Sequence, residues 1–318
     1  METRQLGNTD LHITRIGFGA WAIGGAGWAY SWGAQDDVES VAAIHRAIDL
    51  GINWIDTAAV YGLGHSEEIV AKALEGVTNR PYVFTKCERA WNADNQITPS
   101  LKAESIRREV EDSLRRLKVD VIDLYQVHWP QPDEDIEEGW QTMADLKAEG
   151  KVRWIGVSNF NVGQMQRASV IAPISSLQPP YSLVKPAVQE SILPYCLKNN
   201  IGVIVYSPMQ AGLLSGAMTR ERVANFEPDN WRSRDSEFQE PRLTRNLALQ
   251  NLLGEIGLPY GKSAGEVAIA WTLLNPAVTA AIVGARYADQ VDGVVGAANL
   301  TLSADDLAQI EVFLQQNP

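Results

Sequence analysis

Four polar residues of the sequence each lie near the end of an apolar, strand-like run. Asp56 and Tyr61 follow INWI, Lys86 ends YVFTK, and His128 ends VIDLYQVH. If these runs are neighbouring parallel strands, their side chains meet at one end of a barrel. A tyrosine hydroxyl surrounded by a lysine, an aspartate and a histidine can donate a proton to a carbonyl oxygen. The set therefore predicts a carbonyl reductase.

Acid–base chemistry suggests a role for each member of the set. A free phenol has a pKa of about 10, and a nearby ammonium favours the phenolate, so Lys86 is expected to lower the pKa of Tyr61. Asp56 would keep Lys86 charged, and His128 would orient the carbonyl group. Each residue alone also fits an ordinary role, such as a helix cap for Asp56. No side chain supplies a hydride, so the reaction requires a redox cofactor.

The segments around these residues alternate between strand-like and helix-like patterns, after an N-terminal hairpin that turns at Gly7-Asn8. The predicted strands lie within residues 11–19, 52–58, 81–86, 121–128, 151–160, 174–182, 201–209 and 279–285. Helical patterns separate them, and Ser66 is the expected N-cap of the second helix. This order predicts an α/β fold, a (β/α)8 TIM barrel in which residues 1–318 form one domain. An open doubly wound sheet is less favoured, because no GxGxxG follows the first strand.

Two connections are longer than a barrel requires. Residues 21–37 follow the first strand and are rich in glycine and tryptophan, and residues 210–241 follow the seventh. Long loops in compact domains are usually functional, so we expect these two to form a substrate wall and a cofactor cover. The expected aromatic pocket consists of Trp21, Trp28, Trp32, Trp91 and Trp129. Arg89 could bind an anionic substrate or simply be solvated, and the solvated interpretation is favoured.

Composition, charge and a few local patterns argue against several classes of partner and location. The formal net charge of -12 disfavours nucleic acid and anionic membranes. The apolar stretch 267–285 contains Asn275-Pro276, which predicts a buried helix, a turn and a strand instead of a membrane span. Without a secretory signal pattern at the N-terminus, a cytoplasmic protein is expected. The positions of Cys87 and Cys196 suggest neither a disulfide framework nor a metal site, and Cys87 is expected to be a buried thiol.

The chain resembles the aldo-keto reductase superfamily, in particular its bacterial branch related to inositol-utilisation proteins and potassium-channel β subunits. The resemblance is carried, in order, by DTAAVYGLGHSEE, VFTK, YQVHWP, GKVRWIGVSNF, LQPPYS, VIVYSPMQAGLLSG and IVGARYADQ. It implies a barrel that binds an extended nicotinamide dinucleotide, usually NADPH. It also implies that Asp56, Tyr61, Lys86 and His128 are the catalytic residues.

Cofactor contacts are likewise implied by the resemblance. They are Ser158, Asn159 and Gln178 for the carboxamide, Tyr206 for the ring, Ser207, Pro208, Gly212, Leu213 and Ser215 for the pyrophosphate, and Gly284, Ala285, Arg286 and Gln290 for the adenosine end. The sequence departs from the family pattern at Tyr287, where relatives often carry a second basic residue, and at Gly293–Val295. NADPH stays the expected cofactor because the Arg286 fork suits a 2′-phosphate, and NADH is the alternative.

Other functions share this arrangement of residues. Some relatives serve as cofactor-sensing binding modules with little turnover, and fold alone does not establish catalysis. The same residues would also serve an alcohol or polyol dehydrogenase working in the reverse direction. The expected partner is a small-molecule carbonyl compound, and the sequence leaves its identity, the physiological direction and the oligomeric state open.

Overall fold

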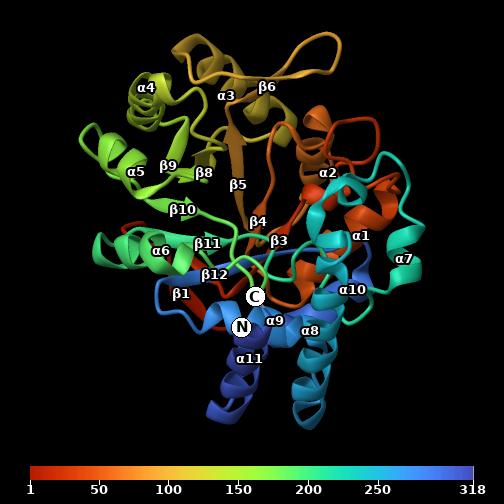
Figure 1. The fold of residues 1–318 in the computed structure, drawn as a ribbon. Helices are drawn as coiled ribbons and strands as arrows, with labels where there is room; N and C mark the ends of the chain where they lie inside the picture. Colours follow the sequence, from red (N-terminus) through yellow and green to blue (C-terminus); the bar gives the residue numbers. More distant parts are fainter. Residues whose placement is uncertain (318) are drawn as a thin grey trace.

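The computed structural model describes residues 1–317, and its centre is a closed barrel of eight parallel strands in the order β10-β11-β12-β3-β4-β5-β8-β9 (Figure 1). The strands are β3 (Ile16–Gly19), β4 (Trp54–Asp56), β5 (Tyr82–Cys87), β8 (Ile122–Val127), β9 (Val152–Ser158), β10 (Ser176–Gln178), β11 (Gly202–Val205) and β12 (Val278–Gly284). The predicted (β/α)8 barrel is confirmed.

Alternation along the strands decides which side chains lie inside the barrel. Successive strand residues point to opposite faces. The buried residues Ile55, Val83 and Tyr125 pack toward the helices. Their neighbours fill the barrel interior together with residues of other strands, namely Trp54, Phe84, Leu124, Trp154, Ile204, Ala280 and Ile282. This interior layer supports the polar residues that follow two positions later on the same strands.

A short hairpin closes the end of the barrel where the strands begin. It pairs β1 (Thr3–Gln5) with β2 (His12–Thr14), as predicted from the turn at Gly7-Asn8. Leu6 and Leu11, in its loop, are fully buried in the interior layer. Gly7 has φ +54, and a Cβ there would lie 2.3 Å from the backbone nitrogen of Gly202. Glycine is therefore required where the hairpin meets the start of β11.

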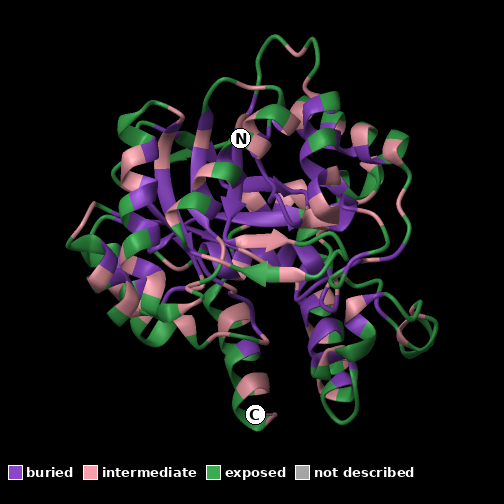
Figure 2. Cartoon of the chain, turned by 90° about the horizontal axis from the view of Figure 1, so that it is seen from above, coloured by how far each residue is buried: buried purple, intermediate pink, exposed green. Residues whose placement is uncertain are grey.

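Helices surround the barrel and separate its strands. They are α1 (Asp37–Asp49), α2 (His65–Ala73), α3 (Ala103–Leu117), α4 (Ile136–Ala148), α5 (Val162–Ser169), α6 (Val188–Lys198), α7 (Arg220–Ala224), α8 (Arg242–Gly257), α9 (Ala264–Leu273), α10 (Ala288–Val295) and α11 (Ala304–Gln316). Figure 2 shows buried residues at the strands and exposed residues on the outer helical faces. None of the helices within residues 1–317 is long and apolar enough to span a membrane.

One local expectation was wrong, and one local element was missed. Ser66 does not cap α2, because the helix begins at His65 after the left-handed Gly64. Instead, the buried Ser66 hydroxyl donates to the carbonyl oxygen of Ala20 at 2.9 Å. The sequence analysis also missed an antiparallel hairpin, β6 (Arg89–Trp91) and β7 (Ile97–Pro99), which lies between β5 and α3. The stretch 267–285 does form the end of α9, a turn and β12, as expected.

Candidate active site

The ends of the strands place a layer of polar side chains directly above the apolar interior. Asp56, Lys86 and Gln126 each follow, by two residues, an interior residue of the same strand. Neighbouring strands are in register here, since Lys86 pairs with Gln126 across β5 and β8. Gln178 ends β10 in the same layer. We call Asp56, Tyr61, Lys86, Gln126 and Gln178 the floor of the site.

Lys86 is the centre of the floor. Its ammonium group donates to Asp56 Oδ1 at 2.6 Å and to the carbonyl oxygen of Thr57 at 2.8 Å, and it lies 3.4 Å from the Tyr61 hydroxyl. The side chain is 1 % exposed and Asp56 is 2 % exposed. A buried charge persists only when it is paired and hydrogen-bonded, and both conditions hold for Lys86.

The Tyr61 loop is shaped by consecutive left-handed residues. Tyr61 begins a short 3-10 turn, and Gly62 and Leu63 after it have φ +62 and +54. A Cβ on Gly62 would lie only 2.0 Å from the carbonyl oxygen of Gly24 in the loop after β3. Glycine at this position therefore lets the two loops touch. The Tyr61 ring meets the His128 ring edge-on, with 5.7 Å between centroids.

Burial controls the proton affinities of these groups. Burial, and then the Asp56 carboxylate, raise the pKa of Tyr61 well above its ordinary value. The predicted lowering of this pKa is not found in the free protein, because burial and the Asp56 carboxylate both raise it. Burial also lowers the pKa of Lys86, against the attraction of Asp56. Burial, with the nearby Lys86 and Arg89 charges, lowers the pKa of His128 well below its usual range, so its imidazole is neutral at pH 7.

The expected carboxamide-binding residues belong to the same hydrogen-bonded network as the floor. Gln178 donates from Nε2 to Asp56 Oδ2 at 2.8 Å and accepts at its backbone oxygen from the Ser158 hydroxyl at 2.8 Å. Asn159 donates to the His128 carbonyl oxygen at 3.0 Å and accepts from the Tyr206 hydroxyl at 2.9 Å. Residues on or directly after five strands are thereby fixed relative to one another.

Gln126 is a floor residue that the sequence analysis missed. It is fully buried, its Nε2 lies 3.4 Å from Asp56 Oδ2, and its Oε1 lies 3.4 Å from the Gln178 amide nitrogen. The signal that could have revealed it is strand parity, because Gln126 precedes His128 by two positions on β8. A polar residue facing the same way as a candidate site residue is a candidate itself.

A cavity of about 1080 Å³ opens above the floor and brings together most of the predicted site residues. Lining it are Asp56, Tyr61, His128, Trp21, Trp28, Trp32, Trp129, Ser158, Asn159, Gln178, Tyr206, Ser207, Pro208, Gly212, Ser215, Gly284, Arg286 and Gln290. Its volume reaches the upper end of the range for small-ligand sites, which suits an extended ligand.

Four predicted residues do not line this cavity. Lys86 is buried behind Asp56 and Tyr61, which do line it. Leu213 is fully buried in a separate apolar cluster, and Ala285 is buried against the helices. The ring of Trp91 lies against the Arg116 guanidinium, 5.6 Å from its centroid, because the β6–β7 hairpin carries it toward α3. Trp231 was missed from the pocket prediction, yet it lines the cavity and stacks on Trp21 at 5.0 Å.

The two long loops meet above the cavity, and we call residues 20–36 and 206–241 the cover. The backbone nitrogen of Trp231 donates to the carbonyl oxygen of Ser31 at 3.0 Å, and Arg234 donates to that of Ala29 at 2.8 Å. Arg232 stacks over the Trp32 ring at 4.5 Å. Contacts of aromatic rings and of backbone groups therefore join the two halves of the cover.

Arg286 ties the first half of the cover to the loop after β12. Its Nε donates to Gln35 Oε1 at 2.5 Å, and its Nη2 donates to the carbonyl oxygen of Ala34. The Gln35 amide returns a hydrogen bond to the Arg286 carbonyl oxygen at 2.9 Å. Arg286 therefore lies at the edge of the cavity, as expected. Two of its guanidinium nitrogens, however, already donate hydrogen bonds to residues of the cover.

The cavity is cationic although the chain is acidic. Its lining includes five arginine or lysine side chains, namely Arg89, Lys185, Arg222, Arg232 and Arg286, against the two carboxylates of Asp56 and Asp235. Asp56 is already paired with Lys86. Burial, then Arg222 and Arg286, lower the pKa of the Arg232 guanidinium to about 10, so it remains charged at neutral pH. A polyanionic ligand would relieve this concentration of positive charge.

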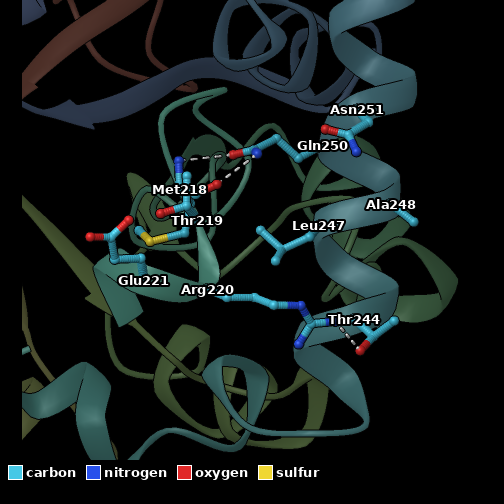
Figure 3. A pocket seen from close by; sticks show the side chains of 9 residues that line it. All are labelled: Met218, Thr219, Arg220, Glu221, Thr244, Leu247, Ala248, Gln250 and Asn251. Atoms are coloured by element: carbon cyan, nitrogen blue, oxygen red, sulfur yellow. Dashed lines mark hydrogen bonds between the residues drawn. The ribbon is translucent and has the colours of Figure 1, made fainter. Parts of the chain in front are cut away.

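A second hollow of about 540 Å³ lies between α7 and α8 and holds none of the predicted site residues (Figure 3). On its wall, the Gln250 side chain of α8 accepts from the backbone nitrogen of Met218 at 3.2 Å and donates to the Met218 carbonyl oxygen at 3.0 Å. Met218 also lines the large cavity. This wall therefore serves to anchor the second half of the cover to α8.

Comparison with known proteins places the chain in a family. A model of the aldo/keto reductase family matches residues 15–315, so the chain belongs to that family. The aldo-keto reductase YhdN of Bacillus subtilis is 41% identical over 99% of this chain and 94% of its own length. The NADH-specific methylglyoxal reductase of Escherichia coli is 34% identical over 96% of both chains.

Solved structures agree with this assignment. The glycerol dehydrogenase AKR11B4 from Gluconobacter oxydans superposes with a TM-score of 0.90 and 38% identity, covering 99% of this chain and 96% of its own. The aldo-keto reductase AKR11C1 from Bacillus halodurans gives a TM-score of 0.81 and 28% identity, covering 98% and 96%. The protein is an NAD(P)H-dependent oxidoreductase of the kind that reduces small carbonyl compounds.

Proposed function

We propose that the protein reduces aldehydes or ketones to alcohols with NADPH, and that Tyr61 is the proton donor. The observation that carries this proposal is the contact of one buried ammonium, Lys86, with both the Asp56 carboxylate and the Tyr61 hydroxyl at the base of a cavity that His128 also lines. The nicotinamide cofactor, when bound, supplies the hydride to the carbonyl carbon. Tyr61 then gives its proton to the carbonyl oxygen.

Each floor residue has a distinct part in this scheme. Tyr61 stays protonated until the alkoxide develops, because its pKa is raised in the free protein. Lys86 stabilises the phenolate that remains, and Asp56 holds Lys86 in place. His128, as a neutral imidazole, donates one hydrogen bond to the carbonyl oxygen and so orients it. Gln126 and Gln178 hold the second oxygen of Asp56.

Steady-state oxidation of NADPH with a reactive aromatic aldehyde tests this scheme. We expect Tyr61→Phe to lower kcat by about a thousandfold, since general acid catalysis contributes roughly 10²–10⁴. The variant should bind NADPH with unchanged affinity, because the hydroxyl is not proposed to contact the cofactor. Tyr206→Phe is the matched control, because it removes a hydroxyl that donates to Asn159 and should keep most of the turnover. Wild-type-like turnover in Tyr61→Phe would refute the assignment.

We infer that Arg286 gives the site its preference for NADPH over NADH. The cationic lining at this edge supports the inference, and a guanidinium fork suits phosphate oxygens. Arg286→Ala should raise the Kd of NADPH roughly tenfold and that of NADH less, as measured by nicotinamide fluorescence. If the affinities for NADPH and NADH fell equally, we would conclude that Arg286 only holds the cover in place. The Escherichia coli relative is named for NADH specificity, so the wild-type ratio of the two Kd values is the first quantity to measure.

The reverse reaction is a second candidate, favoured by the relative named glycerol dehydrogenase. The same floor would accept a proton at Tyr61 while the alcohol carbon loses its hydride to NADP⁺. Reduction of NADP⁺ with glycerol at alkaline pH tests it beside the aldehyde assay. Tight cofactor binding with turnover in neither direction would instead favour the cofactor-sensing module.

A further inference from the structure

A buried glutamate beside the floor has no part in the scheme above. Glu88 directly follows β5, is fully buried, and has φ +88. A residue other than glycine in such a conformation costs about 1–3 kcal/mol, and such strain persists only where surrounding contacts enforce it. The turn at Glu88 sends the β6–β7 hairpin away from the barrel wall. The contacts that hold this turn show which parts of the site depend on it.

Glu88 joins three neighbouring segments by hydrogen bonds. Its Oε2 accepts from the backbone nitrogen of Trp129 at 3.1 Å, one residue after His128. Its own backbone nitrogen donates to Glu109 Oε2 on α3 at 3.0 Å, and its carbonyl oxygen accepts from the backbone nitrogen of Ser100 at 3.0 Å. The carboxyl group is thus one link between the turn after β5 and the turn after β8, beside the hydrogen bond from the His128 backbone nitrogen to the Cys87 carbonyl oxygen at 3.2 Å.

The same carboxyl group also contacts a cavity-lining cation. Glu88 Oε2 lies 3.3 Å from Nε of Arg89, whose Nη2 donates to Gln131 at 3.0 Å and whose guanidinium lies 5.6 Å from the Trp129 ring centroid. Arg89, Trp129 and Gln131 all line the cavity beside His128. The other oxygen of Glu88, Oε1, is buried and accepts no hydrogen bond from any residue in 1–317.

We propose that Glu88 is a positioning residue. Its carboxyl group holds the Arg89 guanidinium at the part of the cavity beside His128 and determines whether the charge of Arg89 is available to the substrate. This proposal rests on the proposed carbonyl reduction and concerns which carbonyl compounds are bound. When the carboxyl group is protonated, Arg89 has a charge available to an anionic substituent of the substrate. When it is ionised, it pairs with Arg89 and neutralises that charge.

The surroundings of Glu88 place its ionisation close to neutral pH. Burial raises the pKa of Glu88 to about 8, against the attraction of Arg89 and with a smaller contribution from Glu109. The charged and titratable groups nearby are Arg89 on β6, Cys87 on β5, His128 directly after β8, and Glu109 on α3 with Arg108 and Arg116 behind it. Burial raises the pKa of Glu109 to about 7. At neutral pH, Glu88 is therefore mostly neutral and Arg89 is free.

The test compares p-carboxybenzaldehyde with p-nitrobenzaldehyde in NADPH oxidation between about pH 6.5 and about pH 9.5, in the range where both substrates keep their charge. In the wild-type protein, the KM of the carboxylated aldehyde should rise roughly three- to tenfold relative to that of the uncharged one as Glu88 ionises. In Glu88→Gln, which keeps an oxygen for Trp129 and has no charge, this KM ratio should not change with pH. The Kd of NADPH should be the same in both proteins.

Glu109→Gln is the matched control, because it neutralises a carboxyl group of similar burial that contacts neither Arg89 nor Trp129. It should keep a KM ratio that depends on pH, with the midpoint moved to lower pH because the Glu109 charge no longer raises the pKa of Glu88. A Glu88→Gln ratio that rises with pH as in the wild type would overturn the proposal, as would equal flattening by both variants. If neither aldehyde is reduced, the proposed function fails separately. Quenching of tryptophan fluorescence by benzoate in the presence of NADP⁺ then applies the same comparison to binding.

Discussion

The residues of the floor lie at or near the ends of the barrel strands, whereas those of the cover belong to two long loops. In the floor, Lys86 and Asp56 are nearly inaccessible to water, and hydrogen bonds join them to residues of several strands. In the cover, the Trp231 ring contacts the Trp32 ring, and the Trp231 backbone nitrogen donates a single hydrogen bond to Ser31. The floor is thus held by the barrel itself, whereas the cover is held by contacts between its halves and by a few ties to Arg286 and to Gln250 of α8.

This difference separates the two tasks of the site. Proton transfer needs groups held in one geometry, and residues on strands of a closed barrel have little freedom to move. A large dinucleotide must enter and leave, and regions that open are those with few buried contacts. We therefore expect substitutions in the floor to affect the folded state and the chemical step, and substitutions in the cover to affect cofactor exchange.

The largest effect is expected when Lys86 is replaced by methionine. Lys86→Met leaves the Asp56 carboxylate buried without its cation, and breaking such a pair costs about 3–5 kcal/mol. Urea denaturation should show this loss, and turnover should fall to background. Adding Asp56→Asn should recover much of the stability and none of the activity. A loss below about 1 kcal/mol in the single variant would mean that the floor does not depend on its charge pair.

A smaller effect on stability is expected when the pH changes. Beside the floor, the pKa values of the glutamates Glu88 and Glu109 are raised, whereas the cover is joined by arginine, indole and backbone groups. Glu88 keeps its proton up to about pH 8 in the folded chain, whereas the unfolded chain loses it near the ordinary value of 4.5. The folded state therefore binds more protons between these values, and stability must fall as pH rises through this window.

Thermal melting between about pH 5 and about pH 9 measures this fall. We expect Glu88→Gln to make this fall in the free energy of unfolding smaller by about 2 kcal/mol, or roughly 3 °C in Tm, because the amide has no proton to lose. Glu109→Gln should reduce it in the same direction, since its pKa is raised to about 7. If Tm depended on pH in the same way in the wild-type protein, in Glu88→Gln and in Glu109→Gln, we would conclude that these two carboxyl groups are in contact with water.

The sequence predicted the floor better than the cover, for physical reasons. Strand alternation and the order of the motifs identify Asp56, Lys86 and His128, because residues of one parity at successive strand ends must converge. The same rule does not indicate how strongly burial acts, so the direction of the Tyr61 pKa shift was predicted wrongly. Local patterns also say nothing of contacts between distant segments.

Three errors share this origin in long-range contacts. The Ser66 hydroxyl bonds to a carbonyl group 46 residues away instead of capping its own helix. Trp91 follows a short hairpin whose direction depends on the turn at Glu88, and so it leaves the cavity. Trp231 joins the cavity only because its loop crosses to the loop after β3. Residues in long loops were therefore assigned by composition, which does not determine their direction.

The smallest effect is expected in the cover, from Trp231→Ala. The substitution removes the stack on Trp21 and the edge contact with Trp32 but keeps the backbone hydrogen bond to Ser31. Aromatic pairs contribute about 0.5–1.5 kcal/mol, so the closed cover should lose about that much. Stopped-flow fluorescence should then show NADPH leaving roughly three- to tenfold faster, with the free energy of unfolding nearly unchanged. Trp91→Ala, a tryptophan outside the cavity, should leave the release rate unaltered. If Trp231→Ala instead slowed the chemical step itself, measured in a single turnover, the cover would be shaping the floor, and the separation between the two regions would not hold.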